Sequence, residues 1–172
     1  MRRSTIRIRD PRVIHHLKDV LRVTQGERLE CFDGRGRAAA GRVTTAARDQ
    51  FVLAVDTRRS VDAKTASISL FQAMIRPERF EWVLEKATEL GVDRIVPIVT
   101  QRCVIRHGPS AARLKRWERI LEAAAAQSGR LALPVLEKPI HFDQALREVS
   151  ASLILIATLA VEGESMKDIV SE

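Results

Sequence analysis

Hydrophobic and polar residues follow two different periods along the chain, and the change falls near residue 65. Before it, apolar residues recur in short alternating runs, which is typical of β-strands. These runs cover residues 4–8, 29–32, 37–45 and 51–57. Asp33-Gly34 predicts a tight turn, and Asp10-Pro11 predicts a helix start, because an Asp cap with proline in the first turn suits a helix N-terminus. This part therefore indicates a compact, mostly antiparallel β-barrel or barrel-like sheet with one short helix.

The stretch 76–97 carries the strongest helical pattern of the chain. Its apolar residues recur at helical spacing and form one buried stripe, comprising Phe80, Val83, Leu84, Ala87 and Leu90. Pro77 suits the first helical turn, and Gly91 can close the helix in a left-handed conformation. Apolar runs at 68–74 and 92–99 flank it and predict strands. The order strand, helix, strand predicts a βαβ unit with a right-handed crossover.

The pattern after residue 100 continues to alternate between helices and strands. It predicts a helix from Ser110 to Gly129, a strand over 131–136, a short helix over 142–149 and a fully apolar strand over 153–157. The polar stretch 56–64 lacks apolar periodicity and is the predicted linker. We therefore expect two domains, a β-barrel at 1–65 and an α/β domain at 66–172, which makes the chain α+β overall.

Positive charge is concentrated in the first of these domains. Residues 1–65 hold fifteen Lys and Arg against eight Asp and Glu, which accounts for the whole net charge of +7. This asymmetry favours a phosphate-rich partner bound by the N-terminal domain. The alternative is an arginine-rich surface that serves solubility alone, as in proteins from high-GC genomes.

Several classes of protein are disfavoured by the sequence. No apolar run approaches the roughly 18 residues of a membrane span, and the N-terminus lacks a signal-peptide core, so we expect a cytoplasmic protein with no membrane partner. Cys31 and Cys103 lack metal-like spacing and are expected to be buried thiols. His15 and Asp19 have i, i+4 spacing, but two ligands without a third predict no metal site.

Polar residues that follow predicted strands and helices are the remaining site candidates, because open α/β sheets bind ligands at the carboxyl edge of their strands. Arg102 follows the strand ending near residue 99, and Gln127 and Arg130 follow the helix that begins at Ser110. Arginine grips phosphate with two parallel hydrogen bonds, and glutamine can bond a base. The alternative is that these residues cap helix and strand ends or serve a subunit interface.

The chain resembles the RsmE family of small-subunit ribosomal RNA methyltransferases in several blocks that occur in the right order. The N-terminal block is His-His-Leu-Lys-Asp-Val-Leu-Arg at 15–22, followed by Gly26 and by Phe32-Asp33-Gly34-x-Gly36. The central blocks are Glu-Trp-Val-Leu-Glu-Lys-Ala-Thr-Glu-Leu-Gly-Val-x-x-Ile-x-Pro at 81–97, Arg102, and Glu-Ala-Ala-Ala-Ala-Gln-Ser-Gly-Arg at 122–130 with Pro134. Several blocks at the right spacing are more specific than any single motif.

The resemblance implies a PUA-like β-barrel joined to a SPOUT-type α/β domain that works as a homodimer. The implied reaction is methyl transfer from S-adenosylmethionine to N3 of a uridine in small-subunit ribosomal RNA, so ribosomal RNA or the small ribosomal subunit is the expected partner. Residues that match the family are expected to contact RNA, with the last three near the uridine or the dimer interface. They are His15, Lys18, Arg22, Arg102, Gln127 and Arg130. No catalytic residue or general base is identified.

One departure from the family concerns the methyl donor. The family's Gly-Pro-Glu-Gly-Gly loop and its later Ile-Leu-Arg-Thr-Glu-Thr-Ala segment, which form a trefoil knot, do not occur in these 172 residues. We therefore expect the knot region to be missing or incomplete, and the cofactor-binding residues to lie C-terminal to Glu172. Two other functions remain open: a non-catalytic RNA-binding module derived from such an enzyme, and an α/β enzyme acting on a free nucleotide.

Overall fold

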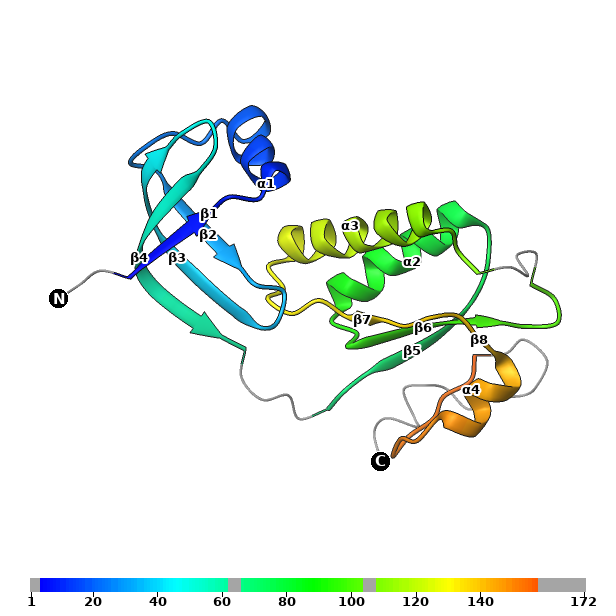
Figure 1. Cartoon of the computed structure of the whole chain (residues 1–172). Helices are drawn as coiled ribbons and strands as arrows, with labels where there is room; N and C mark the ends of the chain where they lie inside the picture. The colour runs from blue at the N-terminus through cyan, green and yellow to red at the C-terminus, as the bar shows by residue number, and fades with distance from the viewer. Residues whose placement is uncertain (1–3, 62–65, 104–107, 158–172) are drawn as a thin grey trace.

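The computed structural model describes residues 4–61, 66–103 and 108–157. Its first part is a four-stranded antiparallel sheet in the order β1-β4-β3-β2 (Figure 1). The strands are β1 (Thr5–Ile8), β2 (Arg28–Phe32), β3 (Arg37–Ala46) and β4 (Phe51–Ser60). All four predicted strands are confirmed within a few residues, although β4 runs into the predicted linker at 56–64.

One helical segment covers the core of this sheet. It begins as α1 (Pro11–His15), capped by the Asp10 carboxylate, and continues as the π-helix η1 (His16–Val20). Ile14 and Leu17 are buried against the sheet, whereas Val20 is exposed. The spacing of the apolar residues predicts a regular α-helix with one buried stripe, comprising Val13, Ile14, Leu17, Val20 and Leu21. Leu21 and Val13 are exposed as well. The wider π turn after His15 rotates the following residues out of the apolar stripe, so that part of the prediction is wrong.

A close approach between β3 and β4 shapes this sheet. The register of the two strands shifts between Ala40 and Gly41. A Cβ atom on Gly41 would lie 2.8 Å from the Ala54 carbonyl carbon and 2.9 Å from the Val55 Cα, closer than packed atoms come. Only glycine lets the two backbones come this near, because it has no side chain.

The second part is a parallel sheet with helices on both faces, as predicted for an α/β domain. Its strands are β5 (Ser69–Ala73), β6 (Arg94–Val99), β7 (Val135–Leu136) and β8 (Ile140–His141), with β6 between β5 and the two short strands. The helices are α2 (Pro77–Leu90), α3 (Ala111–Ser128) and α4 (Phe142–Glu148). Figure 1 shows α2 and α3 together on one face and α4 on the other.

Alternate residues of β6 serve the two faces. Ile95 packs into the cluster formed with α2 and α3, and Val96 and Ile98 pack against Ala145 of α4. At the centre of the larger cluster, the rings of Phe80 and Trp117 lie 4.7 Å apart, and both residues are fully buried. The predicted ends of α2 and α3 are confirmed, because Gly91 and Gly129 adopt left-handed conformations and the Ser110 hydroxyl accepts from the Arg113 N–H.

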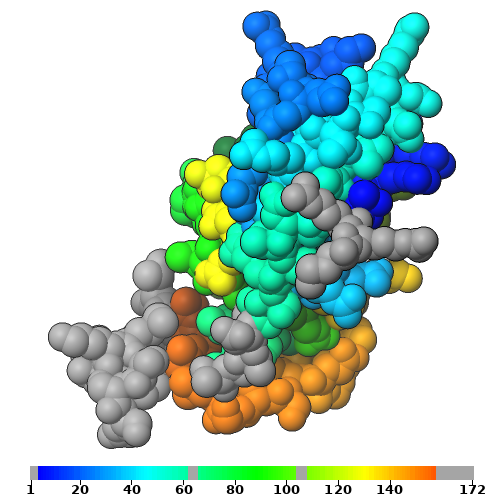
Figure 2. Space-filling view, turned by 90° about the vertical axis from the view of Figure 1, so that its left-hand side faces the viewer, coloured from blue at the N-terminus to red at the C-terminus, as the bar shows by residue number. Residues whose placement is uncertain are grey.

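A short backbone junction joins the two parts. The Gly36 N–H donates to the Leu131 carbonyl at 3.0 Å, and the Leu133 N–H donates to the Gly34 carbonyl at 2.9 Å. Figure 2 shows the C-terminal end of α3, in yellow, directly beside the strands of the antiparallel sheet. The Asp33-Gly34 turn therefore does more than close a hairpin. It pairs with the stretch following α3, so only Val135–Leu136 of the predicted strand 131–136 joins the parallel sheet.

The prediction of a buried strand over 153–157 is wrong. This stretch is irregular, and its residues Leu153, Ile154, Leu155 and Ile156 are 43–67% exposed. A strand needs a neighbour to pair with, and no described strand pairs with this stretch. The predicted domain boundary near residue 65 falls outside the described residues and stays a prediction. Within the described ranges, no helix combines the length and apolar character that a membrane crossing requires.

Candidate nucleic-acid interface

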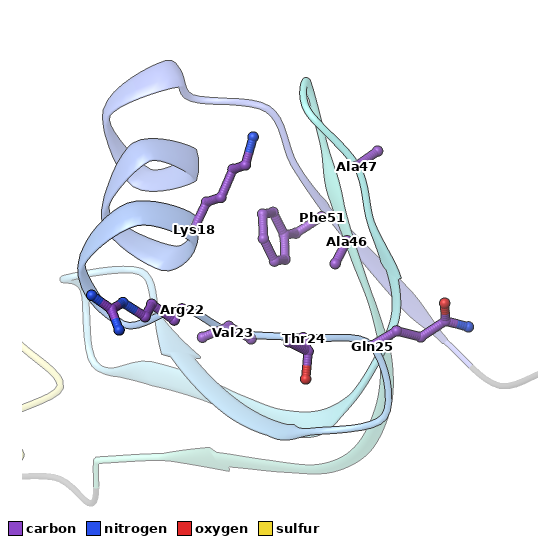
Figure 3. A pocket seen from close by; sticks show the side chains of 8 residues that line it. All are labelled: Lys18, Arg22, Val23, Thr24, Gln25, Ala46, Ala47 and Phe51. Atoms are coloured by element: carbon purple, nitrogen blue, oxygen red, sulfur yellow. The ribbon is translucent and has the colours of Figure 1, made fainter.

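A pocket of about 440 Å³ lies between η1 and the β3–β4 hairpin; we call it the barrel pocket (Figure 3). It contains two of the predicted RNA-binding residues, Lys18 and Arg22, and the ring of Phe51 stands at its centre. Its lining consists of Lys18, Arg22, Val23, Thr24, Gln25, Ala46, Ala47 and Phe51. The barrel pocket thus combines an apolar floor with two cationic side chains, which are four positions apart in the sequence.

Arg22 has an unusual backbone. Among the described residues, Arg22 is the one non-glycine residue with a positive φ, which is 54°. A left-handed conformation costs an L-residue with a side chain roughly 1–2 kcal/mol. Strained residues of this kind concentrate at functional sites, where the surrounding structure holds them.

His15 lies on α1, next to the barrel pocket but not in its lining. Its Nδ1 atom lies 2.6 Å from the Asp19 carboxylate, and its side chain is 72% exposed. The i, i+4 pairing expected from the sequence is therefore present. A role for His15 in RNA contact stays a prediction.

A second pocket, of about 410 Å³, opens where β5 and β6 end; we call it the carboxyl-edge pocket. Arg102 lines it, as the strand-end argument predicted, together with Arg76 and Arg79. The sequence analysis missed these two arginines. The same argument would have found them, because they directly follow β5 at the start of α2. The remaining lining residues are Ala73, Met74, Ile75, Thr100 and Cys103.

Arg130 and Gln127 lie at the opposite edge of the parallel sheet from Arg102, so the structure does not bring these three together. The Arg130 Nε donates to the Glu89 carbonyl at 3.2 Å, and its guanidinium covers Gly91. Arg130 thus holds the end of α2, as the capping alternative expected. Gln127 is exposed at the end of α3. Contact of either residue with RNA stays a prediction.

The cysteines offer little for catalysis. Cys103 is buried, and its Sγ lies 3.3 Å from both the backbone nitrogen and the hydroxyl of Thr100. Cys31 is half-buried, and burial raises the pKa of its thiol, which keeps it protonated at neutral pH. Among the residues that the structure describes, no three His, Cys, Asp or Glu side chains are grouped so as to hold a metal ion.

Comparisons with known proteins identify the class. Residues 62–171 match a family model described as an RNA methyltransferase domain, and residues 8–56 match an RNA methyltransferase PUA domain. The chain therefore belongs to the RNA methyltransferase family whose members join a PUA domain to a methyltransferase domain. Within it, the resemblance to the RsmE type is confirmed, because the curated relatives are named ribosomal RNA small subunit methyltransferase E.

The relatives are similar over most of this chain. The protein from Mycobacterium bovis is 31% identical over 160 residues, which cover 90% of this chain and 61% of the relative. The protein from Synechocystis sp. is 30% identical over 137 residues, which cover 80% of this chain and 44% of the relative. The chain thus spans about half the length of the curated relatives that it matches.

Solved structures share the fold. The methyltransferase Lpg2936 from Legionella pneumophila, solved with bound SAM, matches with a TM-score of 0.83 and 29% identity, over 96% of this chain and 69% of that one. Ribosomal RNA small subunit methyltransferase E from Neisseria gonorrhoeae, bound to S-adenosylmethionine, matches with a TM-score of 0.75 and 31% identity, over 86% and 61%. The expected combination of a PUA-like domain and a SPOUT-type α/β domain is confirmed.

Proposed function

We propose that this chain acts in the methylation of N3 of a uridine in small-subunit ribosomal RNA, with S-adenosylmethionine as methyl donor, and that it holds the RNA through its cationic pockets. The observation that carries the proposal is the pairing of two cationic pockets with two matched domains. The barrel pocket lies in the segment that matches the PUA domain, and the carboxyl-edge pocket lies in the methyltransferase segment.

The chemistry calls for positive charge near the uridine. The N3 proton must leave before the nitrogen can accept a methyl group, and a nearby guanidinium stabilises the anion that remains. Arg102 is the predicted site residue that lines a pocket at the edge where open α/β sheets bind ligands. Arg102 contributes to the positive charge at this edge, and we assign no single guanidinium to direct contact with the anion.

The carboxyl-edge pocket does not fit the sulfonium of the methyl donor. S-adenosylmethionine would supply the methyl group from a positively charged sulfonium, and three arginines rim the carboxyl-edge pocket. Like charges repel at this range, so we assign none of these residues to the donor. A homodimer and a cytoplasmic location are further parts of the proposal, taken from the resemblance.

A calorimetric titration of the 172-residue chain with S-adenosylmethionine separates the catalytic proposal from a non-catalytic RNA-binding module. An enzyme active at this length must bind the donor saturably and must methylate a small-subunit ribosomal RNA fragment, which nucleoside mass spectrometry detects. RNA binding without donor binding would favour the module for this chain. Binding of a free nucleotide with little salt dependence would instead favour an enzyme of free nucleotides, because an RNA grip through several arginines weakens steeply as salt rises.

The barrel pocket yields a prediction that separates affinity from stability. The variant Arg22→Gly removes one cationic contact, so RNA affinity should fall about threefold to tenfold and the salt slope by roughly 0.7 to 1. Its thermal midpoint should not fall, because glycine relieves the left-handed strain while adding about 0.4–1 kcal/mol of chain entropy to the unfolded state. Fluorescence anisotropy with a labelled RNA and differential scanning calorimetry measure the two effects.

The matched control for this variant is Arg22→Lys, which keeps the charge and the strain. It should retain most of the RNA affinity. If Arg22→Gly bound RNA as tightly as the wild-type chain, the barrel pocket would not be an RNA contact.

A further inference from the structure

We propose that Arg76, Arg79 and Arg102 form a clamp for a backbone phosphate of the bound RNA, next to the nucleotide that is modified. The clamp occupies the carboxyl-edge pocket. This inference rests on the proposed function, because it names the group of the RNA that this pocket receives.

The three arginines reach one pocket from two separate segments of the chain. Arg76 and Arg79 come from the junction of β5 and α2, whereas Arg102 comes from the turn after β6. All three line one open pocket of about 410 Å³. That volume lies within the range of roughly 300–1,000 Å³ typical of small-molecule sites, so a phosphate with part of its nucleotide can enter.

The three positive charges of this pocket are unpaired among the described residues. Among the described residues, the guanidiniums of Arg76, Arg79 and Arg102 have no hydrogen bond and no ion pair, although the structure shows such pairs for other arginines. Nearby Arg116, for example, makes a two-point pair with Glu81 at 2.7 and 2.8 Å. No carboxylate is among the described residues that line the pocket. Three like charges around one pocket repel each other, and a bound anion removes that repulsion.

Helix α2 begins at the edge of the carboxyl-edge pocket. This helix begins at Pro77 and runs for 14 residues, and its cap residue, Arg76, makes no side-chain capping bond. The positive end of its dipole therefore lies at the pocket, and the acidic residue of its first turn, Glu78, is not among the described residues that line the pocket. The dipole adds to the field of the three guanidiniums and favours an anion at this edge.

The pocket's floor favours a nucleotide over a free ion. Ala73 and Ile75 are half-buried and line it with apolar surface, next to the buried Met74. An inorganic ion gains nothing from such a floor, whereas a ribose or base covers it. Arginine suits the phosphate itself, because its planar fork donates two parallel hydrogen bonds to two oxygens. We therefore assign the pocket to a phosphodiester of RNA and not to the carboxylate of the methyl donor.

The test is the salt dependence of RNA binding by the double variant Arg76→Gln/Arg102→Gln of the 172-residue chain. A labelled single-stranded fragment of small-subunit ribosomal RNA is titrated by fluorescence anisotropy between about 50 and 200 mM KCl, the range over which phosphate contacts weaken measurably. Each phosphate contact to a single strand contributes roughly 0.7 to the slope of log affinity against log salt. The double variant should therefore lose roughly 1.4 from the slope and bind about tenfold more weakly at the low-salt end.

The matched control is Lys115→Gln/Arg119→Gln, which removes the same charge from exposed positions on α3. Its slope should stay close to that of the wild-type chain. An equal fall in both variants would show a general charge effect and overturn the clamp. The thermal midpoints of both variants should match the wild type, because all four side chains are exposed.

Two further outcomes separate this inference from the proposed function. If the wild-type chain binds RNA with a steep salt slope and the pocket variant keeps that slope, the clamp is wrong while the proposed function stands. If the wild-type chain shows no salt-dependent RNA binding, both are wrong. Weaker binding of S-adenosylmethionine by the pocket variant, with an unchanged RNA slope, would assign the pocket to the donor and overturn the clamp.

Discussion

The variant Gly41→Ala is expected to unfold the N-terminal sheet or to lower the free energy of unfolding by about 3 kcal/mol or more. The added methyl group would meet the Ala54 carbonyl group and the Val55 Cα. Both are backbone positions of a paired strand, so no side chain can move aside to make room. The two strands would have to separate at the register shift, which breaks the longest strand pairing in this sheet.

Urea denaturation followed by far-UV circular dichroism measures this effect. Gly108→Ala is the control, because a Cβ atom there would have no neighbour within 4 Å among the described residues. The control should change stability by less than about 0.5 kcal/mol. Wild-type stability of the Gly41 variant would mean that β3 and β4 lie farther apart in solution.

The variant Trp117→Ala should lower the free energy of unfolding of the α/β domain by about 3–5 kcal/mol. Trp117 is fully buried, and its ring lies against Phe80 at the point where α2 and α3 meet over the sheet. Removing it leaves a cavity that the two helices cannot fill without moving. Denaturant unfolding followed by circular dichroism measures the loss.

Two tryptophan substitutions serve as controls for this prediction. Trp82→Ala should cost less than about 1 kcal/mol, because Trp82 is 61% exposed on α2. Trp117→Phe should keep much of the stability, since the buried Trp117 Nε1 has no hydrogen-bond partner among the described residues and phenylalanine carries no such group. Equal losses from Trp82→Ala and Trp117→Ala would contradict the assignment of the core.

Most elements of the fold could be predicted because their signals are local. The ends of α2 follow from Pro77 and Gly91, and the β2–β3 hairpin follows from Asp33-Gly34. The errors arise where pairing depends on distant residues. The stretch after Gly129 has a strand pattern over 131–136, but its first residues pair with the turn at Gly34, and the apolar run at 153–157 is exposed.

The candidate site could be predicted only in part. Lys18 and Arg22 were found because they belong to the N-terminal block that matches the RsmE family, and Arg102 was found because it follows a strand. Arg76 was missed because a helix-starting motif hid its place at the same sheet edge. The position of Arg130 depends on the packing of α3 against the end of α2, which the sequence pattern alone does not contain.

The backbone junction between Gly34 and Leu133 fixes how far the barrel lies from the carboxyl-edge pocket. It fixes the barrel beside the last turn of α3, whereas the carboxyl-edge pocket lies toward the first turn of that helix. The 18 residues of α3 extend for about 27 Å, which is the rise of roughly eight stacked base pairs. A mononucleotide is too short to span this length, so contact with both the barrel and the carboxyl-edge pocket calls for a folded stem or a run of several nucleotides.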